Sequence, residues 1–180
     1  SMSYTGKKKP KKNKKGEFIK EEHKAISEKE RHAIFENTAP RWDGKVRVQE
    51  LLQGYRNLRR QLIQKAEGDV LEVAAGSGRN MRFYSSARVK SLTLTDFSRK
   101  MLNQCEKKTH LTAPIPCHLK MANVYKLDFE DEQFDCVVDT FGICSFEKPL
   151  ESLKEIARVC KSDGKILLLE HGAPHHKYAT

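Results

Sequence analysis

The residues best suited to ligand chemistry lie between positions 69 and 80, where the sequence reads D-V-L-E-V-A-A-G-S-G-R-N. Gly76 and Gly78 allow a sharp backbone turn and leave room for a ligand to approach. A helix that opens after this turn offers unpaired N–H groups and the positive end of its dipole. Glu72 precedes the turn, which is a poor position for holding a pyrophosphate but a good one for ordering the turn. We therefore expect a ligand that carries a positive charge and an amino acid moiety.

Asp96 is a second acid with a chemical interpretation, because it ends an apolar segment twenty residues after Gly76. An acid in this position accepts hydrogen bonds from both hydroxyls of an adenosine ribose; alternatively, it caps a helix that starts at Ser98. Phe97 and Met101 either lie along an adenine or pack in the core. A dinucleotide fingerprint needs a third glycine at position 81, where this chain has a methionine. On the glycine motif alone, a dinucleotide site and a plain strand–turn–helix corner both remain open.

The elements that position these residues alternate between strand and helix. Apolar and β-branched runs predict strands, and apolar residues at helical spacing predict helices. The expected strands cover 69–73, 91–95, 117–121, 134–139 and 165–170, the last after a turn at 162–164, and the expected helices cover 17–37, 46–64, 80–86, 98–109 and 150–160. This order predicts an α/β fold with a parallel sheet and helices on both faces. Ligands of such sheets bind at the carboxyl ends of the strands. Three arginines of the 46–64 helix, Arg56, Arg59 and Arg60, are expected to face solvent.

Charge is distributed unevenly along the 180 residues. The formal net charge is +10, and seven lysines within residues 1–16 supply most of it, in a segment without acids or an apolar cluster. We expect a disordered arm at 1–16, a helical segment and lid at 17–67, and a ligand-binding domain at 68–180. The arm is either a solvated tail or a contact for nucleic acid, an anionic membrane surface or an import receptor.

Five scattered cysteines without a C-x-x-C pair indicate free thiols in a reducing compartment and no metal site. Cys144 lies near the fourth strand, but the sequence supplies no base beside it, so we do not interpret it as a nucleophile. His171, His175 and His176 form no recognisable metal motif. No apolar stretch approaches the length of a membrane span.

Four segments together resemble the class I S-adenosylmethionine (SAM) methyltransferases. They are V-L-E-V-A-A-G-S-G-R at 70–79, L-T-L-T-D-F-S at 92–98, M-A-N-V-Y-K-L-D-F with the following F-D at 121–135, and L-K-E-I-A-R-V-C-K-S-D-G-K-I-L-L-L-E at 153–170. Upstream, I-F-E-N-T-A-P-R-W-D at 34–43 resembles the ubiquinone/menaquinone biosynthesis C-methyltransferases (methyltransferase type 11). Residues 58–80 are similar to a mitochondrial, membrane-associated branch of that group.

The resemblance implies a Rossmann-like class I methyltransferase fold that binds SAM and releases S-adenosylhomocysteine. The implied cofactor contacts are Glu72, Ala74, Gly76, Ser77, Gly78, Asp96, Phe97, Met101, Asn123, Val124, Asp139, Thr140 and Phe141. Asn123 stands where the family usually has an acid that bonds the adenine amino group. Trp42 would form part of a lid, and Ile143 would face the methyl acceptor.

The expected function is methyl transfer to a small or lipid-like, quinone-type acceptor, with no catalytic base assigned. Alternatives are an RNA or protein methyltransferase anchored by the lysine arm, and a non-catalytic assembly factor with the same fold. The family continues with two strands beyond the fifth, so we expect the sheet to lack the last two strands. An open edge of this kind favours homodimer formation by strand pairing. The expected location is mitochondrial, or otherwise cytoplasmic or nuclear.

Overall fold

The structure is a computed structural model that describes residues 27–171, apart from the side chains of residues 45, 47–49 and 51. The lysine arm, His175 and His176 lie outside the described residues. None of the helices described between residues 27 and 171 has the length and apolar character of a membrane span.

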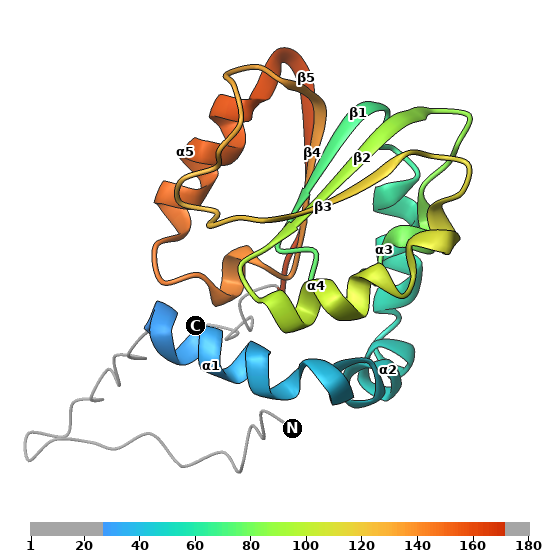
Figure 1. Cartoon of the computed structure of the whole chain (residues 1–180). Helices are drawn as coiled ribbons and strands as arrows, with labels where there is room; N and C mark the ends of the chain where they lie inside the picture. Colours follow the sequence, from blue (N-terminus) through green and yellow to red (C-terminus); the bar gives the residue numbers. More distant parts are fainter. Residues whose placement is uncertain (1–26, 172–180) are drawn as a thin grey trace, which may run out of the picture.

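A five-stranded parallel sheet forms the centre of the molecule (Figure 1), in the order β3-β2-β1-β4-β5. The strands are β1 (Gly68–Val73), β2 (Val89–Asp96), β3 (Cys117–Met121), β4 (Phe134–Thr140) and β5 (Cys160–Leu169). The strand order changes direction beside β1, and ligands of such sheets bind at the carboxyl ends of the strands next to this point. The predicted α/β class and the parallel sheet are confirmed.

Helices cover both faces of this sheet. The α-helices are α1 (Glu28–Thr38), α2 (Trp42–Leu52), α3 (Tyr55–Ile63), α4 (Arg99–Glu106) and α5 (Pro149–Val159), with short 3₁₀ helices η1 (Ala39–Arg41), η2 (Met81–Phe83), η3 (Thr109–Thr112) and η4 (Ile143–Ser145). On one face, Ile63 of α3 and Cys105 of α4 pack with Leu94 of β2. On the other, Ile156 of α5 packs with Val137 of β4. Alternating residues of the buried strands therefore supply two separate apolar layers.

Several predicted elements differ from the observed ones. The single helix expected at 46–64 is two helices, because Gly54 adopts a left-handed conformation (φ 71°) between α2 and α3. A regular helix does not follow the glycine turn: the chain there forms turns and the three-residue η2. The helix-dipole argument for that turn was therefore wrong. The turn expected at 162–164 is part of β5, which begins at Cys160 and contains a register shift opposite Phe134–Cys136.

The helix expected at 17–37 begins at Glu28, where Ser27 caps it and Glu30 completes a capping box. Residues 17–26 lie outside the described part. At the edges of the described sheet, β3 and β5 each have one neighbouring strand, and Ile166 and Leu168 of β5 are exposed. Homodimer formation through an edge remains a prediction.

Candidate active site

Asp96 links the carboxyl end of β2 to the glycine turn that follows β1. Its Oδ2 accepts a hydrogen bond from the Gly76 N–H (2.9 Å), and its Oδ1 accepts one from the Ser98 N–H (2.8 Å). Ser98 itself, rather than the side chain of Asp96 alone, caps α4 by accepting from the Met101 N–H (3.1 Å). Asp96 is buried, and burial raises the pKa of its carboxyl. The acid thus fixes the turn, and its remaining lone pairs stay available for further donors.

The two glycines of the turn have different roles. Both have positive φ values, 56° for Gly76 and 76° for Gly78. A Cβ on Gly76 would meet no atom closer than the Ala74 carbonyl oxygen at 3.9 Å, whereas a Cβ on Gly78 would lie 2.9 Å from both Cys105 Sγ and Met81 Sδ. Gly76 therefore leaves open space above the backbone, and Gly78 is required by the close packing of α4 and η2 against the turn.

Glu72 lies within β1 and is bound entirely by the protein. Asn80 Nδ2 donates to its Oε1 (2.9 Å), and the Tyr84 hydroxyl donates to its Oε2 (2.6 Å). Burial raises the pKa of this carboxyl to about 7. Glu72 thus orders the segment after the glycine turn, which fits one half of its expected role. Its contact with a ligand remains a prediction, and Tyr84 is a partner that the sequence analysis missed.

Asp139 and Glu170 form a pair of acids at the carboxyl ends of β4 and β5. Asp139 Oδ2 accepts from the N–H groups of Gly142 (3.2 Å) and Ile143 (3.1 Å). Glu170 accepts from the N–H groups of Ile143 and Cys144, both at 3.1 Å. Burial, followed by the hydrogen bond to Glu170, raises the pKa of Asp139 to about 9. Asp139 Oδ1 is buried and has no hydrogen-bond partner among the described residues.

The loop after β4 carries an aromatic and imidazole cluster. Phe141 (φ 61°) contacts the ring of His171 at 4.4 Å and that of Tyr55 at 5.1 Å between centroids. His171 Nδ1 lies 3.5 Å from Cys144 Sγ, so the expectation that no base lies near this thiol was wrong. Partial desolvation and Glu170 nevertheless raise the pKa of Cys144, which is exposed at the surface, to about 12, so the thiol remains protonated and is a poor nucleophile.

An ionic network attaches α2 and α3 to the glycine turn. Asp43 accepts from the Ser77 hydroxyl (2.6 Å) and pairs with Lys108 and Arg79. Glu50 pairs with Arg79 and with Arg59 (2.9 Å). The network therefore holds the segment before the sheet against the turn.

Arg59 extends this network to the end of β4. Its Nη1 donates to Thr140 Oγ1 (2.6 Å) and to Asn80 Oδ1 (3.1 Å). The residue is only 7% exposed, so the prediction that it faces solvent was wrong, whereas Arg56 and Arg60 are exposed as expected.

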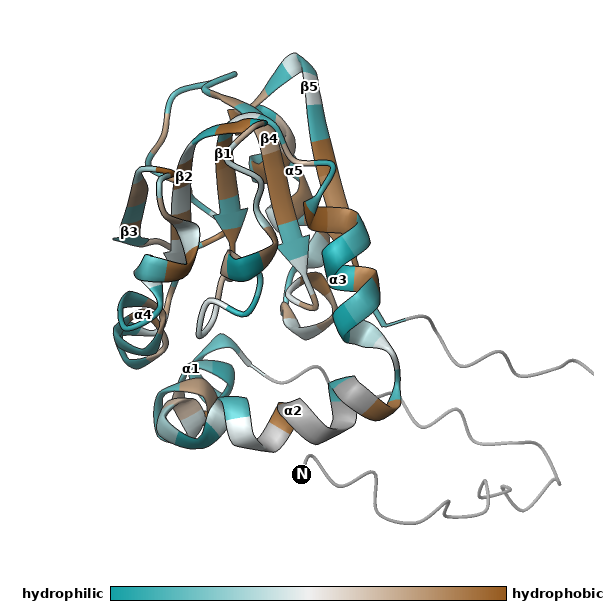
Figure 2. Cartoon of the chain, turned by 90° about the vertical axis from the view of Figure 1, so that its right-hand side faces the viewer, coloured by the Kyte–Doolittle hydropathy of each residue, from teal (hydrophilic) through white to brown (hydrophobic). Residues whose placement is uncertain are grey.

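Helix α1 lies across the carboxyl ends of the strands, and Figure 2 shows the arrowheads of β1 and β4 pointing toward α1 and α2. The Arg31 guanidinium lies 3.9 Å from the Phe97 ring centroid and 5.0 Å from that of Phe146. Phe35 of the same helix packs edge-on against Trp42 at 5.2 Å. One side of the predicted adenine-stacking residue, Phe97, is thus covered by α1, and Trp42 lies in the segment expected to form a lid.

The remaining expected contacts are distributed around this edge. Met101 is buried, Val124 is buried within the second apolar layer, and Ile143 is partly buried against that layer. Asn123 is exposed, and its Oδ1 accepts from the Tyr125 N–H (3.0 Å), so its carbonyl is used within the local turn.

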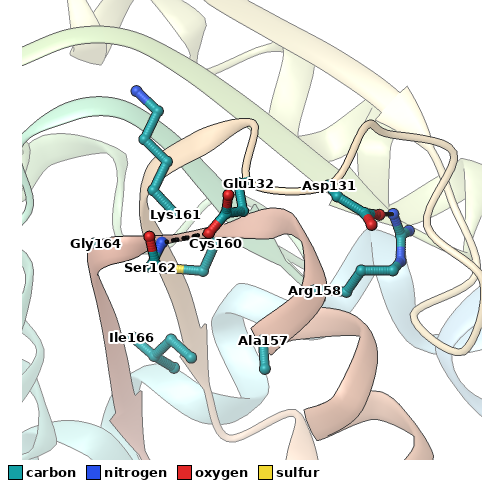
Figure 3. Close-up of a pocket in the computed structure, with 9 residues that line it drawn as sticks. All are labelled: Asp131, Glu132, Ala157, Arg158, Cys160, Lys161, Ser162, Gly164 and Ile166. Atoms are coloured by element: carbon teal, nitrogen blue, oxygen red, sulfur yellow. Dashed lines mark hydrogen bonds and ion pairs between the residues drawn. The ribbon is translucent and has the colours of Figure 1, made fainter.

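A pocket of about 530 Å³ lies elsewhere, beside the start of β5 (Figure 3). Its charged side chains are paired locally: Arg158 with Asp131 at 2.7 Å, and Lys161 with Asp135 at 2.6 Å. None of the expected site residues lines it. Within residues 27–171 no group of three or more metal-binding side chains occurs.

The carboxyl edge fits a cationic ligand such as SAM. Four acids lie at the ends of adjacent strands, namely Glu72, Asp96, Asp139 and Glu170, and none of them forms an ion pair with the described residues. Their hydrogen-bond donors are neutral backbone and side-chain groups. Gly76 leaves open space above the turn, whereas the Asp139 carboxyl is fully buried beside Gly142.

Residues 71–168 match the family described as "Methyltransferase domain", which is more than half of the chain. The chain belongs to this family. The methyltransferase domain is 29% identical to the mitochondrial methyltransferase OMS1 of Saccharomyces cerevisiae, over 81% of the chain and 34% of that protein. It is 33% identical to the ubiquinone/menaquinone biosynthesis C-methyltransferase UbiE of Citrifermentans bemidjiense, over 83% of the chain and 67% of that enzyme.

A third relative is the phosphatidylethanolamine N-methyltransferase of Cereibacter sphaeroides, 36% identical over 59% of the chain and 52% of that enzyme. The methyltransferase domain thus spans between a third and about half of the length of several relatives. Among solved structures, the complex of DhpI with SAM and HEP has a TM-score of 0.65 at 17% identity, covering 84% of this chain and 70% of that one. This similarity confirms the class I methyltransferase fold.

Proposed function

We propose that this chain binds SAM at the carboxyl edge of its sheet and transfers the methyl group to a small or lipid-like, quinone-type acceptor. The observation that carries the proposal is the row of acids at the ends of β1, β2, β4 and β5, which the described part of the protein leaves without ion pairs. SAM carries a sulfonium and an ammonium group, so its charge complements these acids. A pyrophosphate needs hydrogen-bond donors and positive charge, and these acids supply neither.

The residues of the chain position the cofactor and limit water. Asp96 orders the turn at Gly76 and would accept hydrogen bonds from the ribose hydroxyls, while the amino acid end of the cofactor would lie toward the ends of β4 and β5. Helix α1 covers the edge through Arg31 and Phe97. When bound, SAM supplies an already activated methyl group, so the protein's main contributions are orientation and exclusion of water.

The acceptor side is assigned to the cluster of Phe141, Tyr55 and His171 at the end of β4. Aromatic surfaces pack well against a flat or apolar acceptor. The relatives named as quinone and phosphatidylethanolamine methyltransferases support an acceptor of this kind. The relative named as mitochondrial supports the same location for this protein.

Calorimetric titration with SAM tests the cofactor assignment. We expect binding in the micromolar range, and about 10- to 100-fold weaker binding for Asp96→Asn, because hydrogen bonds to a charged group are each worth about 1.5–3 kcal/mol. Asp128→Asn is the matched control, because this exposed carboxylate pairs with Lys120 on the surface. A folded wild-type protein that binds neither SAM nor S-adenosylhomocysteine would refute the proposal and favour a non-catalytic assembly factor.

We also propose that the lysines of residues 1–16 contact an anionic surface, since this segment holds seven lysines and no acid. Vesicles with and without phosphatidylserine test this directly. Deleting residues 1–16 should abolish binding to the anionic vesicles. Salt-sensitive RNA binding that disappears with the same deletion would instead support the RNA methyltransferase alternative.

A further inference from the structure

Arg31 of α1 is a buried cation that lies against aromatic rings at the carboxyl edge of the sheet. Its guanidinium carbon is 3.9 Å from the ring centroid of Phe97 and 5.0 Å from that of Phe146, and the residue is only 6% exposed. The carboxylate that binds this guanidinium, through Nε (2.9 Å) and Nη2 (2.7 Å), is Glu28 of the same helix. Outside its own helix the guanidinium therefore contacts rings, and within residues 27–171 no acid of the sheet edge pairs with it.

The surface of Phe97 that Arg31 covers is suited to a purine ring. A guanidinium is planar and stacks on aromatic faces, and a nucleic acid base stacks on them in the same way. Phe97 directly follows Asp96, the acid that we expect to accept the ribose hydroxyls, so a nucleoside held by this acid has its base close to the ring. Burial raises the pKa of Asp96, and the positive charge of Arg31 opposes this rise, which places the guanidinium within electrostatic reach of the acid.

Hydrogen bonds near both ends of α1 hold Arg31 in this place. Near the start of the helix, Glu28 accepts from the Tyr125 hydroxyl (2.7 Å), and near its end Glu36 accepts from the Ser98 hydroxyl (2.7 Å). The helix is thus tied to the loop after β3 and to the N-terminus of α4. Each of these bonds is only partly buried, so water replaces it at a small net cost when the helix moves.

We propose that Arg31 covers the adenine surface of Phe97 in the free protein, and that SAM binds only after α1 carries this side chain away. The inference rests on the proposed function and adds a form of regulation to it, because α1 is then an internal competitor of the cofactor. Arg31 is buried and is bound to Glu28 of its own helix, so the side chain leaves the ring together with α1. The adenine replaces the guanidinium, and the ring of Phe97 is covered in both states.

Replacing Arg31 by alanine removes the competitor. The apparent affinity for a ligand falls in proportion to the fraction of the protein that is competent to bind it. A contact between a cation and rings that is shielded from water favours the closed form by about 5- to 30-fold. In calorimetric titration, Arg31→Ala should therefore bind SAM about 5- to 30-fold more tightly than the wild type, whereas Lys29→Ala, at an exposed position of α1, should bind it equally. Unchanged or weaker binding by Arg31→Ala would overturn the inference.

A neutral ligand separates competition for the ring from repulsion between charges, because Arg31→Ala also removes a positive charge near a cationic cofactor. The probe is 5′-methylthioadenosine, which carries the adenine but neither the sulfonium nor the ammonium group. Competition for the ring of Phe97 predicts the same gain in affinity for this probe as for SAM. A gain confined to SAM would show that charge repulsion is its origin, and the inference would be wrong.

The movement of α1 has its own reporter in Trp42. It is the only tryptophan in the sequence, and its ring packs against Phe35 of α1 at 5.2 Å between centroids. Saturating SAM should change the tryptophan emission of the wild type, and an unchanged emission would contradict the movement.

Tyr125→Phe takes the place of Arg31→Ala if the latter does not fold. It removes one attachment of α1 and leaves the rings intact, so it should bind both SAM and 5′-methylthioadenosine at least about twofold more tightly. Affinities equal to those of the wild type would then count against the inference. If neither the wild type nor a folded variant binds SAM at all, it is the proposed function that fails, whereas binding without any gain in the variants refutes the competition alone.

Discussion

Replacing Arg59 by alanine tests whether the segment before the sheet is held by the ionic network. The guanidinium binds Glu50 through Nε (3.0 Å) and Nη2 (2.9 Å), and it also donates to Thr140 and Asn80. Removing one partner of a buried ion pair costs about 3–5 kcal/mol. Because Glu50 keeps its pair with Arg79, we expect the lower end of this range, about 3 kcal/mol, in the free energy of unfolding.

Urea unfolding followed by circular dichroism measures this loss, with Arg60→Ala as the matched control. Arg60 is the next residue of α3 and is exposed, so its replacement should change the free energy of unfolding by no more than about 0.5 kcal/mol. If Arg59→Ala is as stable as Arg60→Ala, the network contributes no net stability, and the attachment of α3 to the site must have another origin.

Three further changes test other parts of the site. Gly142→Ala should destabilise the protein by about 1–3 kcal/mol in urea unfolding, because the new Cβ would lie 2.1 Å from a buried carboxyl oxygen. Gly44→Ala is the control: a Cβ there meets nothing within 4 Å, so the change should stabilise α2 by about 0.5–1 kcal/mol. A Gly142→Ala protein that is more stable than the Gly44→Ala protein would contradict the geometry. Glu72 has a folded-state pKa of about 7, above its ordinary value of 4.5, so the native state retains a proton that the unfolded chain loses. Its contribution to stability should therefore fall by about 3 kcal/mol as the pH rises from 4.5 to 7, and Glu72→Gln should flatten the measured pH profile of unfolding in this window. Arg31→Ala should lower the free energy of unfolding by about 1–2 kcal/mol through loss of the buried contact with aromatic rings, whereas Lys29→Ala, at an exposed position of α1, should leave it unchanged; equal effects would argue against the contact.

The first, second and fourth strands were predictable because they are mainly apolar and β-branched runs bounded by a clear break. Residues 117–121 were placed correctly as a strand, and the fourth strand differs by one residue. Asp96 was expected at the end of β2 and lies there. These features depend on local sequence: β-branched and apolar residues form the buried strands, and a polar residue marks the edge.

The errors arose where contacts distant in sequence decide the structure. Arg59 shows no sign in the sequence that Glu50 and Thr140 will surround it, because Thr140 lies 81 residues away. The apolar spacing of 46–64 continues across Gly54, so periodicity alone gives one helix where the left-handed glycine makes two. The pairing of Asp139 with Glu170 requires β4 and β5 to be neighbours in register, a fact that only the sheet order supplies.

No regular α-helix follows the glycine turn, and this makes the turn poorly suited to an anionic ligand. A pyrophosphate site depends on backbone N–H groups and a helix dipole at the turn. Here the turn leads into the three-residue η2, and one N–H of the turn, that of Gly76, is already bonded to Asp96. The same edge holds four acids whose hydrogen-bond donors are neutral, and burial raises the pKa of Asp96 and Asp139. Such a site gains free energy when a positive charge arrives and loses it when a negative charge arrives. We therefore expect this edge to favour a sulfonium nucleoside over a dinucleotide, a choice that the glycine motif alone leaves open.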